Sequence, residues 1–386
     1  MRVMPGQWLG VLGGGQLGRM FCQSAQAMGY RVVVLDPDPE GPASVLADEH
    51  ICAAYDDEVA LTELAKRCQA VTTEFENVPA ASLELLSRRL RVAPGAKAVS
   101  TAQDRSAEKA FIRAQGVPVA PYADIRTLDD LRGAAANLFP GIIKAARLGY
   151  DGKGQHRVAN LEQAIEAFLA MGQVPCVLEA RLDLARELSV VLARDEQGKC
   201  AVYPVARNVH HNGILAVTHV DGCSDEQTLA ACAAAKRIAD GLGYHGVMCV
   251  EFFVLADGSL LANEMAPRPH NSGHFSQNAC VTSQFEQQAR VMAGLPLGDT
   301  RLLCPTVMLN LLGDVWLSSG GTNAVEPDWV SVLALPGTSL HLYGKTEARL
   351  GRKMGHINVT GATMPEVLET ANQIVAYLGL PVRATP

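Results

Sequence analysis

The sequence lacks the features of several classes of protein. It has no apolar run of the ~18 residues that a membrane helix needs, and it does not begin with the pattern of a secretory signal. Basic residues are not in excess: the sequence has 33 Lys and Arg against 40 Asp and Glu, so its formal net charge is −7. That charge excludes the overall positive field of a general nucleic-acid binder. We therefore expect a soluble, cytoplasmic protein with no membrane and no nucleic-acid partner.

The ten cysteines include no CxxC pair, which argues against a zinc knuckle or a redox motif. We interpret them as reduced side chains, several of them in the core, such as Cys249 in GVMCVEFFV. Aromatic residues are few at 5%, but hydrophobic residues make up 48% and exclude a disordered chain. At about 150 residues per domain, 386 residues predict two or three domains.

Secondary-structure patterns divide the chain near residue 105. Before it, strands such as 8–13 and 31–36 alternate with helices such as 16–28, which predicts a parallel sheet with crossover helices. After it, 186–220 predicts three antiparallel strands, with hairpin turns at 195–198 and 212–213. The helices predicted in this second part lie at 106–115, 127–137, 161–171, 224–241, 276–293 and 364–378.

The first motif is a glycine loop between a strand and a helix. Gly13, Gly15 and Gly18 fit GxGxxG, whose backbone N–H groups approach an anion at a helix N-terminus. Asp36 ends the next strand, where a dinucleotide enzyme places the acid that binds ribose. The loop thus predicts a phosphate or substrate site. The alternatives are an NAD-dependent oxidoreductase or a turn that only allows tight packing.

The second motif is a glycine-rich tip between two strands. Lys144 and Arg147 precede the tip, which contains Gly149, Gly152 and Gly154. Such a tip can fold over phosphates, and Lys144 can reach a phosphate as a point charge. A strand rather than a helix follows, so this is no Walker A loop.

The third motif is a pair of carboxylates on a hairpin. Glu251 lies in the apolar strand VEFF, and Asn263 and Glu264 lie on the next strand, across a turn at 256–258. A carboxylate in an apolar strand is costly to bury unless it is paired or binds a cation. Two acids and an amide oxygen suit Mg2+ that also binds nucleotide phosphates.

Two further segments carry polar donors. The loop MAPRPHNSGH follows the acids directly and presents Arg268, His270, Asn271 and His274, which predicts a site for a substrate anion. Cations at 343–345 and 351–353 could clamp one phosphate, although a charged surface fits them equally well.

Together these segments resemble the ATP-grasp superfamily, and within it the 5-(carboxyamino)imidazole ribonucleotide synthase family. The resemblance rests on GGGQLGRM, TEFENV, AQDR, GYDGKGQ, NEMAPRPHNSGH, YGK and GRKMGH, which span residues 13 to 356. It implies an α/β fold: a biotin-carboxylase-like parallel-sheet domain at 1–105, a two-lobed ATP-grasp domain at 106–300 and a small β-rich domain at 301–386. The ATP-grasp lobes would cover about 106–183 and 184–300.

The resemblance also implies where ATP binds. Arg105 and Lys144 match nucleotide-binding cations, and Glu187 matches the acid on the ribose hydroxyls. The segment 179–182 would meet adenine through its backbone. The remaining matches to the ATP site are Gly149, Tyr150, Asp151, Gly152, Lys153, Gly154, Gln155, Glu179, Ala180, Arg181, Leu182, His210, Asn263 and Glu264. Glu251 and Glu264 match the ligands of Mg2+.

The second substrate implied is aminoimidazole ribonucleotide. Residues matched to its binding are Gln16, Leu17, Glu76, Arg268, His270, Asn271, Lys345 and Arg352, with Glu74 as an alternative to Glu76. The catalytic candidates are Arg268, Lys345, Tyr150 and Asp151. The implied reaction is ATP-dependent carboxylation by bicarbonate through carboxyphosphate, in purine biosynthesis, with Mg2+ and without biotin. A homodimer is expected on the same ground.

Three alternatives remain at this stage. The nearest is another ATP-grasp ligase, such as a formate-dependent glycinamide ribonucleotide transformylase, to which the 266–274 loop is a poorer match. An NAD-dependent oxidoreductase rests on the glycine loop and Asp36 alone. The third is a non-catalytic nucleotide-binding or scaffold protein of the same fold.

Overall fold

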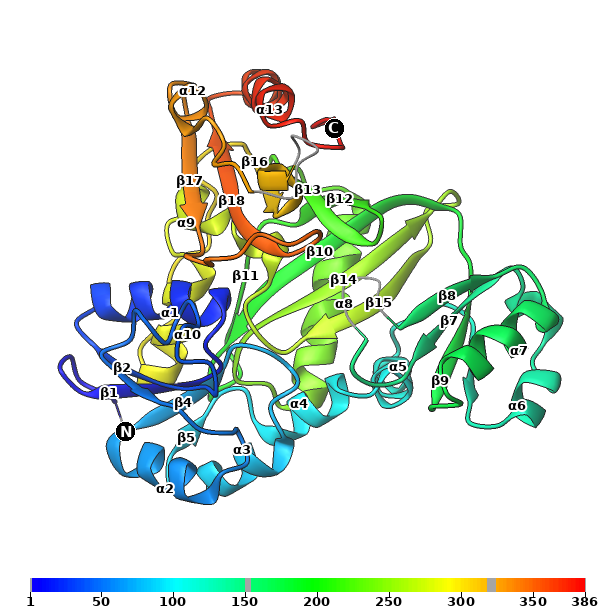
Figure 1. Cartoon of the computed structure of the whole chain (residues 1–386), viewed down its shortest axis with the longest axis horizontal. Coiled ribbons are helices and arrows are strands. Elements are labelled where there is room, and N and C mark those ends of the chain that lie inside the picture. The colour runs from blue at the N-terminus through cyan, green and yellow to red at the C-terminus, as the bar shows by residue number, and fades with distance from the viewer. Residues whose placement is uncertain (1, 150–153, 318–323, 386) are drawn as a thin grey trace.

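The computed structural model describes residues 2–149, 154–317 and 324–385. Its elements form three sheets (Figure 1). One sheet belongs to the N-terminal part, one to a small lobe that stands apart, and one runs through the rest of the molecule. Over the described residues, no helix combines the length and apolarity needed to cross a membrane.

The N-terminal sheet is parallel throughout, as the strand–helix alternation predicted. Its five strands follow the order β3 (Glu49–Ile51), β2 (Arg31–Leu35), β1 (Trp8–Leu12), β4 (Ala70–Thr73) and β5 (Arg91–Val92). Side chains alternate between its two faces: Leu9 and Val11 pack toward α1 (Gln16–Ala27), and Leu12 packs on the opposite face. The opposite face is covered by α2 (Glu58–Arg67), α3 (Ala80–Ser87) and α4 (Ala96–Ala102).

The small lobe is a four-stranded antiparallel sheet in the order β6 (Tyr122–Ile125), β9 (Cys176–Ala180), β7 (Gly141–Ala145) and β8 (Gln155–Val158). Helices α6 (Leu128–Arg132) and α7 (Leu161–Ala170) share its core. The glycine-rich tip joins β7 to β8, as predicted. The helix predicted at 127–137 ends at Gly133, and only a 3-10 turn at Ala136–Leu138 follows it.

The large sheet has nine strands. Its main path is β15 (Leu260–Ala266), β14 (Gly246–Leu255), β10 (Leu184–Arg194), β12 (Ala206–His211), β13 (Ile214–Val220), β16 (Thr306–Leu312), β18 (Lys353–Thr360) and β17 (Thr338–Leu342). Strand β11 (Cys200–Val202) pairs with β10 beside this path. The region 186–220 thus holds four strands rather than the three predicted, because the chain leaves the sheet between β11 and β12 at Pro204.

The C-terminal strands extend this sheet. Strand β16 pairs antiparallel with β13, so the predicted β-rich segment at 301–386 continues the sheet that carries the acidic hairpin. Helix α13 (Met364–Leu378) covers the end strands and has the predicted bounds. Short helices α11 (Asp314–Leu317) and α12 (Trp329–Leu333) lie in the same region. The face of the sheet near β10 and β14 is covered by α8 (Glu226–Leu242).

The helix predicted at 276–293 is two helices, α9 (Ser276–Ala279) and α10 (Gln284–Ala293). The first helix ends before Cys280, whose backbone forms an isolated β-bridge with Leu302. The second helix begins after Ser283, whose side chain accepts from the backbone N–H of Glu286 and caps that helix. Helix α10 then packs on α1, with Phe285 and Met292 in the N-terminal core. The N-terminal sheet and the large sheet are therefore joined through a buried helix (Figure 1).

Candidate active site

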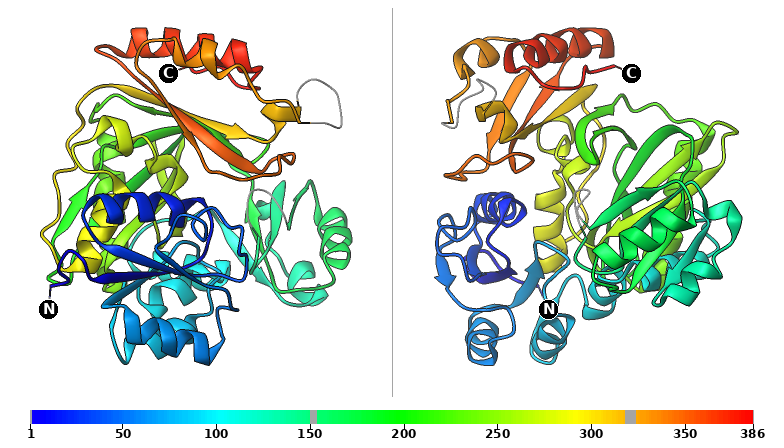
Figure 2. Two further views of the ribbon diagram at one scale, coloured as in Figure 1. Left: turned by 60° about the vertical axis from the view of Figure 1, so that its left-hand side comes forward. Right: turned by 45° about the vertical axis from the view of Figure 1, so that its right-hand side comes forward.

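Two cavities adjoin at the centre of the molecule. Pocket A, of about 620 Å3, is lined by residues at the start of α1 and in the segment between β17 and β18. The backbone of that segment lies above α1 (Figures 1 and 2). Pocket B, of about 460 Å3, lies between the small lobe and the large sheet. Six residues line both pockets: Glu76, Asn77, Arg268, His270, Asn271 and Lys353. The two pockets therefore share one wall.

The glycine loop at the edge of pocket A binds carboxylates of its own chain. Glu74 accepts from the N–H groups of Gly15 (2.5 Å) and Gly18 (2.8 Å), and Asp36 accepts from Gly14 (2.6 Å). The positive end of α1 favours these anions. Burial raises the pKa of Glu74 even though the two N–H groups oppose the shift.

This arrangement corrects two sequence interpretations. The loop is not an open phosphate cradle, because Glu74 and Asp36 already occupy its N–H groups. Asp36 also accepts from Tyr55 and from Asp38 N, so it is not available as the ribose acid of an NAD enzyme. Gln16 and Leu17, which follow the loop, do line pocket A as predicted.

Glu76 and Arg268 form an ion pair on the wall that the pockets share. Arg268 donates from Nε and Nη2 to the two carboxylate oxygens of Glu76, a fork that fixes both planes. Burial alone raises the pKa of Glu76, but Arg268 outweighs it and lowers the pKa to about 2. Both residues are charged at neutral pH, so this wall presents an ordered dipole to each pocket.

The acidic hairpin forms the floor of pocket B. Glu251 on β14 and Glu264 on β15 both line the pocket, as the motif predicted. Burial and the neighbouring Glu264 raise the pKa of Glu251 to about 7. Arg105, at the start of α5 (Arg105–Ala114), donates to Glu264 at 3.0 Å and to the Gly149 carbonyl at 3.1 Å. The floor is thus a pair of acids that favours a cation.

Lys144 reaches pocket B from β7, and a buried acid holds it there. Glu179 on β9 accepts from Lys144 (3.1 Å) and is also paired with Lys109 of α5 (3.2 Å). Glu179 is only 3% exposed, and burial would raise its pKa, but the two lysines lower it. The sequence assigned the backbone of Glu179 to the adenine segment, and the structure adds that its carboxylate holds Lys144 in place.

The other residues of the predicted adenine segment lie at the crossing between the lobes. The N–H groups of Ala180 and Arg181 already donate to the carbonyls of Pro121 and Pro140. Leu182 lies in the same connection, just before β10. The predicted contacts between this backbone and adenine would therefore be made by the carbonyl groups of the segment and by Leu182.

Glu187 and His210 face each other on neighbouring strands of pocket B. Their side chains are 2.9 Å apart, from Oε2 to Nδ1, and both line the pocket. Burial would lower the pKa of His210, but Glu187, Glu251 and Glu264 outweigh it and raise the pKa. Asn263 and Gln155 line the same pocket.

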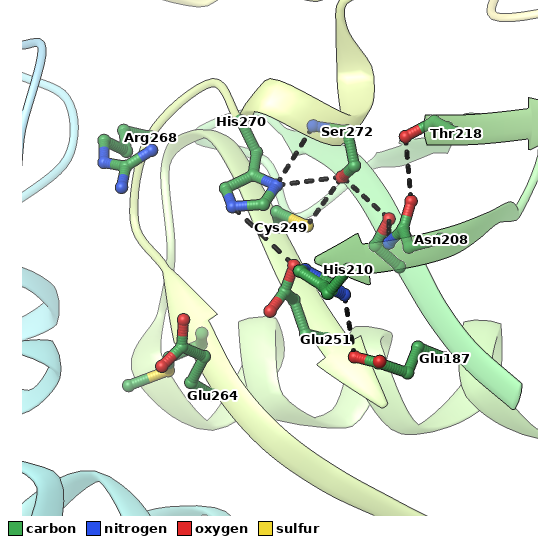
Figure 3. Close-up of polar contacts among 12 residues, drawn as sticks. Glu187, Asn208, His210, Thr218, Cys249, Glu251, Glu264, Arg268, His270 and Ser272 are labelled. Carbon is green, nitrogen blue, oxygen red and sulfur yellow. Dashed lines mark hydrogen bonds and ion pairs between the residues drawn. The ribbon is translucent and has the colours of Figure 1, made fainter. Parts of the chain in front are cut away.

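The loop after β15 brings His270 between the two acids and a buried group of hydroxyls (Figure 3). His270 Nε2 is 3.8 Å from Glu251 Oε1, and its Nδ1 is 2.8 Å from Ser272 Oγ. Burial and Arg268 hold the pKa of His270 well below its ordinary value. His274 also lines pocket A, but it is only 1% exposed and its ring packs on His356 at 4.6 Å between centroids.

The C-terminal cations lie at pocket A. Lys345 and Arg352 line the pocket beside Lys353 and Arg349. Lys345 donates to the Lys353 carbonyl at 2.7 Å, and Arg352 donates to the Glu347 carbonyl at 2.6 Å. Both bonds lie between the end of β17 and the start of β18, so they fix the two cations relative to that segment's own backbone.

The predicted site residues fall mostly in the two pockets. Tyr150, Asp151, Gly152 and Lys153 lie outside the described residues, whereas Gly149 lines pocket B and Gly154 begins the return of the tip. The sequence missed Glu108 and Lys109 of α5, which are both about 1–2% exposed. Nothing in the spacing of RSAEKAF distinguishes them from a pair that faces solvent.

Comparison with known proteins agrees with this geometry. Family models match a ribonucleotide synthetase preATP-grasp domain at 7–103, an ATP-grasp domain at 110–285 and a phosphoribosylaminoimidazole carboxylase C-terminal domain at 306–370. The N5-carboxyaminoimidazole ribonucleotide synthase of Brucella melitensis is 45% identical over 92% of this chain and 96% of that protein.

Two solved structures are similar over nearly the whole chain. The Staphylococcus aureus N5-carboxyaminoimidazole synthetase with ADP has a TM-score of 0.88 and 36% identity, and covers 98% of each chain. The Aspergillus clavatus enzyme with ADP and 5-aminoimidazole ribonucleotide has a TM-score of 0.87 and 30% identity, over 97% of this chain and 99% of that one. These comparisons confirm the predicted fold class and the predicted ATP-dependent ligase. The chain belongs to the N5-carboxyaminoimidazole ribonucleotide synthase family of ATP-grasp ligases.

Proposed function

We propose that this chain carboxylates 5-aminoimidazole ribonucleotide, using ATP and bicarbonate and releasing ADP and phosphate, in purine (IMP) biosynthesis. The observation that carries the proposal is the pair of adjoining pockets, which share the wall of Glu76, Arg268 and His270. Pocket B has the acids and lysine of a nucleotide site. Pocket A has cations at one end and the ion-paired wall at the other. The names of the relatives fit both assignments.

In pocket B, ATP would lie between the small lobe and the large sheet. Lys144 and Arg105 would contact phosphate oxygens through N–H groups that their bonds to Glu179 and Glu264 do not use. Glu187, paired with His210, would accept from the ribose hydroxyls. Gly149 and Gln155, which are described residues of the tip, line pocket B beside this site.

Mg2+ fits the acidic floor of pocket B. Burial and Glu264 raise the pKa of Glu251, so a cation between the two carboxylates would relieve their repulsion. Within the described residues, no cluster of three His, Cys, Asp or Glu side chains could hold a metal by itself. Two protein carboxylates with phosphate oxygens as further ligands are what Mg2+ commonly accepts. When bound there, Mg2+ would neutralise the charge of the phosphates.

In pocket A, the ribonucleotide would place its phosphate against Lys345 and Arg352, and its base near Gln16 and Leu17. Its amine would then point to the shared wall, near Glu76, Arg268 and Asn271. Of the two acids in TEFENV, we assign Glu76 to the substrate, because Glu74 is engaged by Gly15 and Gly18.

The reaction would begin in pocket B, where a bicarbonate oxygen attacks the γ-phosphate and ADP leaves, which forms carboxyphosphate. At the shared wall, the amine nitrogen would bond to the carboxyl carbon, either of carboxyphosphate or of the carbon dioxide that it releases. Inorganic phosphate leaves and the amine loses one proton. Arg268, fixed by Glu76, would orient the anion during transfer. No step needs biotin.

We also propose that the protein acts in the cytoplasm as a homodimer. All ten cysteines are free thiols in the described chain, as expected in a reducing compartment. The homodimer rests on the family resemblance alone.

The test is ADP release from magnesium-ATP with the ribonucleotide and bicarbonate each present or omitted. We expect release that needs the ribonucleotide and falls when bicarbonate is removed. Turnover driven by glycinamide ribonucleotide and formate, or an intact ATP pool in every mixture, would refute the proposed reaction.

A further inference from the structure

The imidazole of His270 is held in one tautomer by its own loop. The backbone N–H of Ser272 donates to Nδ1 at 3.3 Å, so Nδ1 acts as an acceptor and carries no proton. In a neutral imidazole the proton then resides on Nε2. The Ser272 hydroxyl, 2.8 Å from the same Nδ1, must therefore donate to it as well.

A buried chain of hydrogen bonds leads to Ser272, and the donors along it make the Ser272 hydroxyl a donor to His270. Thr218 Oγ1 donates to Asn208 Oδ1 (2.9 Å), Asn208 Nδ2 donates to Ser189 Oγ (2.9 Å), and Ser189 Oγ donates to Ser272 Oγ (2.7 Å). Because Ser272 Oγ accepts from Ser189, its own proton is left for His270 Nδ1 at 2.8 Å, which is much closer than its other neighbour, Cys249 Sγ at 3.8 Å. An amide has a donor end and an acceptor end, so Asn208 sets the direction of the whole chain.

The sheet places this chain beside the acidic floor. Ser189 lies on β10 directly opposite Glu251 on β14, and Asn208 on β12 lies opposite Thr218 on β13. Ser189, Thr218 and Ser272 are all 0% exposed, and Asn208 is 7% exposed. Water does not compete for these groups, so the chain keeps one arrangement. Figure 3 shows His270 between Glu251 on one side and Ser272 on the other.

The proton on Nε2 faces the junction of the two pockets. His270 lines both of them, and its Nε2 is 3.8 Å from Glu251 Oε1. This distance is too long for a direct hydrogen bond and leaves an oxygen of a ligand or water to accept the proton.

We propose that Ser272, Ser189, Asn208 and Thr218 are positioning residues, which set the tautomer of His270 and so hold it as a neutral Nε2–H donor to an anion at the junction of the two pockets. The inference rests on the proposed function. A neutral imidazole is a far weaker acid than an imidazolium, so it stabilises the anion by a hydrogen bond and does not transfer a proton to it.

The first test is the tautomer itself. Nitrogen-15 NMR of the whole protein with labelled histidines, with the His270 signals identified by their loss in His270→Gln, should show an unprotonated Nδ1 and a protonated Nε2. The Ser272→Ala variant should shift the Nδ1 signal, since only the backbone donor remains. Ser276→Ala is the matched control, because Ser276 is equally buried and bonds only to backbone groups. A protonated Nδ1 in the parent protein would overturn the proposal.

The second test compares variants of His270 in ribonucleotide-dependent ADP release and product formation. His270→Ala should lower kcat about 100-fold, as loss of one donor to a reacting anion does. In His270→Gln the amide nitrogen takes the place of Nε2, so activity should stay within about tenfold of the parent. His270→Asn places its amide nitrogen near Nδ1 and should resemble His270→Ala.

If the His270→Gln variant is as inactive as His270→Ala, His270 exchanges protons during the reaction, and its assignment as a neutral hydrogen-bond donor is wrong. If the parent protein shows no ribonucleotide-dependent ADP release, the proposed function fails. The nitrogen spectrum would still decide the tautomer in that case.

Discussion

The Gly15→Ala variant tests how tightly Glu74 closes the glycine loop. A Cβ at Gly15 would lie well inside van der Waals contact of Glu74 Oε1 and 2.9 Å from Oε2. The φ of Gly15 is −80°, which alanine adopts easily, so the cost comes from space and not from backbone strain. The carboxylate must move, and its bonds to the N–H groups of Gly15 and Gly18 are then lost or lengthened.

The expected cost follows from those two bonds. A hydrogen bond to a charged group contributes about 1.5–3 kcal/mol, so losing both sets an upper limit of roughly 3–6 kcal/mol. Since the loop can shift by a few tenths of an ångström, we expect a loss of about 3 kcal/mol in the free energy of unfolding. The KM for the ribonucleotide should rise as well, because Gln16 and Leu17 follow the loop directly into pocket A.

Gly95→Ala is the matched control. Gly95 also caps a helix, α4, with a φ of −74°, and no heavy atom lies within 4 Å of a Cβ built there. The two variants share the cost of placing alanine at an N-cap and differ only in Glu74. Urea unfolding followed by circular dichroism measures both, and Glu74→Ala completes a double-mutant cycle. Equal losses in the two glycine variants, or a full loss at Gly15 after Glu74 is removed, would refute the reasoning.

Three further predictions concern the pockets. Glu264→Gln should abolish ADP formation without unfolding the protein, and substantial turnover at saturating magnesium would contradict the assigned ligand. Arg352→Ala should raise the KM for the ribonucleotide far more than the KM for ATP, and equal effects would exclude the phosphate clamp. Burial and Glu264 raise the pKa of Glu108 from 4.5 to about 8, so the stability due to its bound proton is lost as pH rises through about 8. The melting temperature of the Glu108→Gln variant should therefore fall less between pH 5 and pH 8 than that of the parent protein. An unchanged slope of melting temperature against pH would contradict the raised pKa of Glu108.

Those parts of the site that are formed by residues close together in the sequence could be predicted from its motifs. Glu251 and Glu264 sit on one hairpin, and strand alternation with a short turn is enough to predict that they meet. Arg268 and His270 follow within a few residues, so their place beside the acids was also predictable.

Partners that are distant in sequence were not predictable in the same way. The glycine loop has the pattern of an anion site, but the anion is Glu74, 59 residues away. The break between α9 and α10 depends on a bridge from Cys280 to Leu302, and no local signal in 276–293 encodes it. Lys109 has the composition of a surface residue, and only the packing of α5 against β9 shows that it balances Glu179.

The large sheet, which contains strands from both the ATP-grasp region and the C-terminal region, also affects how the chain behaves during its synthesis. Strand β13 emerges from the ribosome before β16, the strand that covers its edge, and about 85 residues separate the two. During that interval β13 presents unpaired backbone groups and apolar side chains, which can pair with another nascent chain. Release of residues 306–360 ends this exposure, so the last part of the chain protects the first-made strands of the sheet from aggregation.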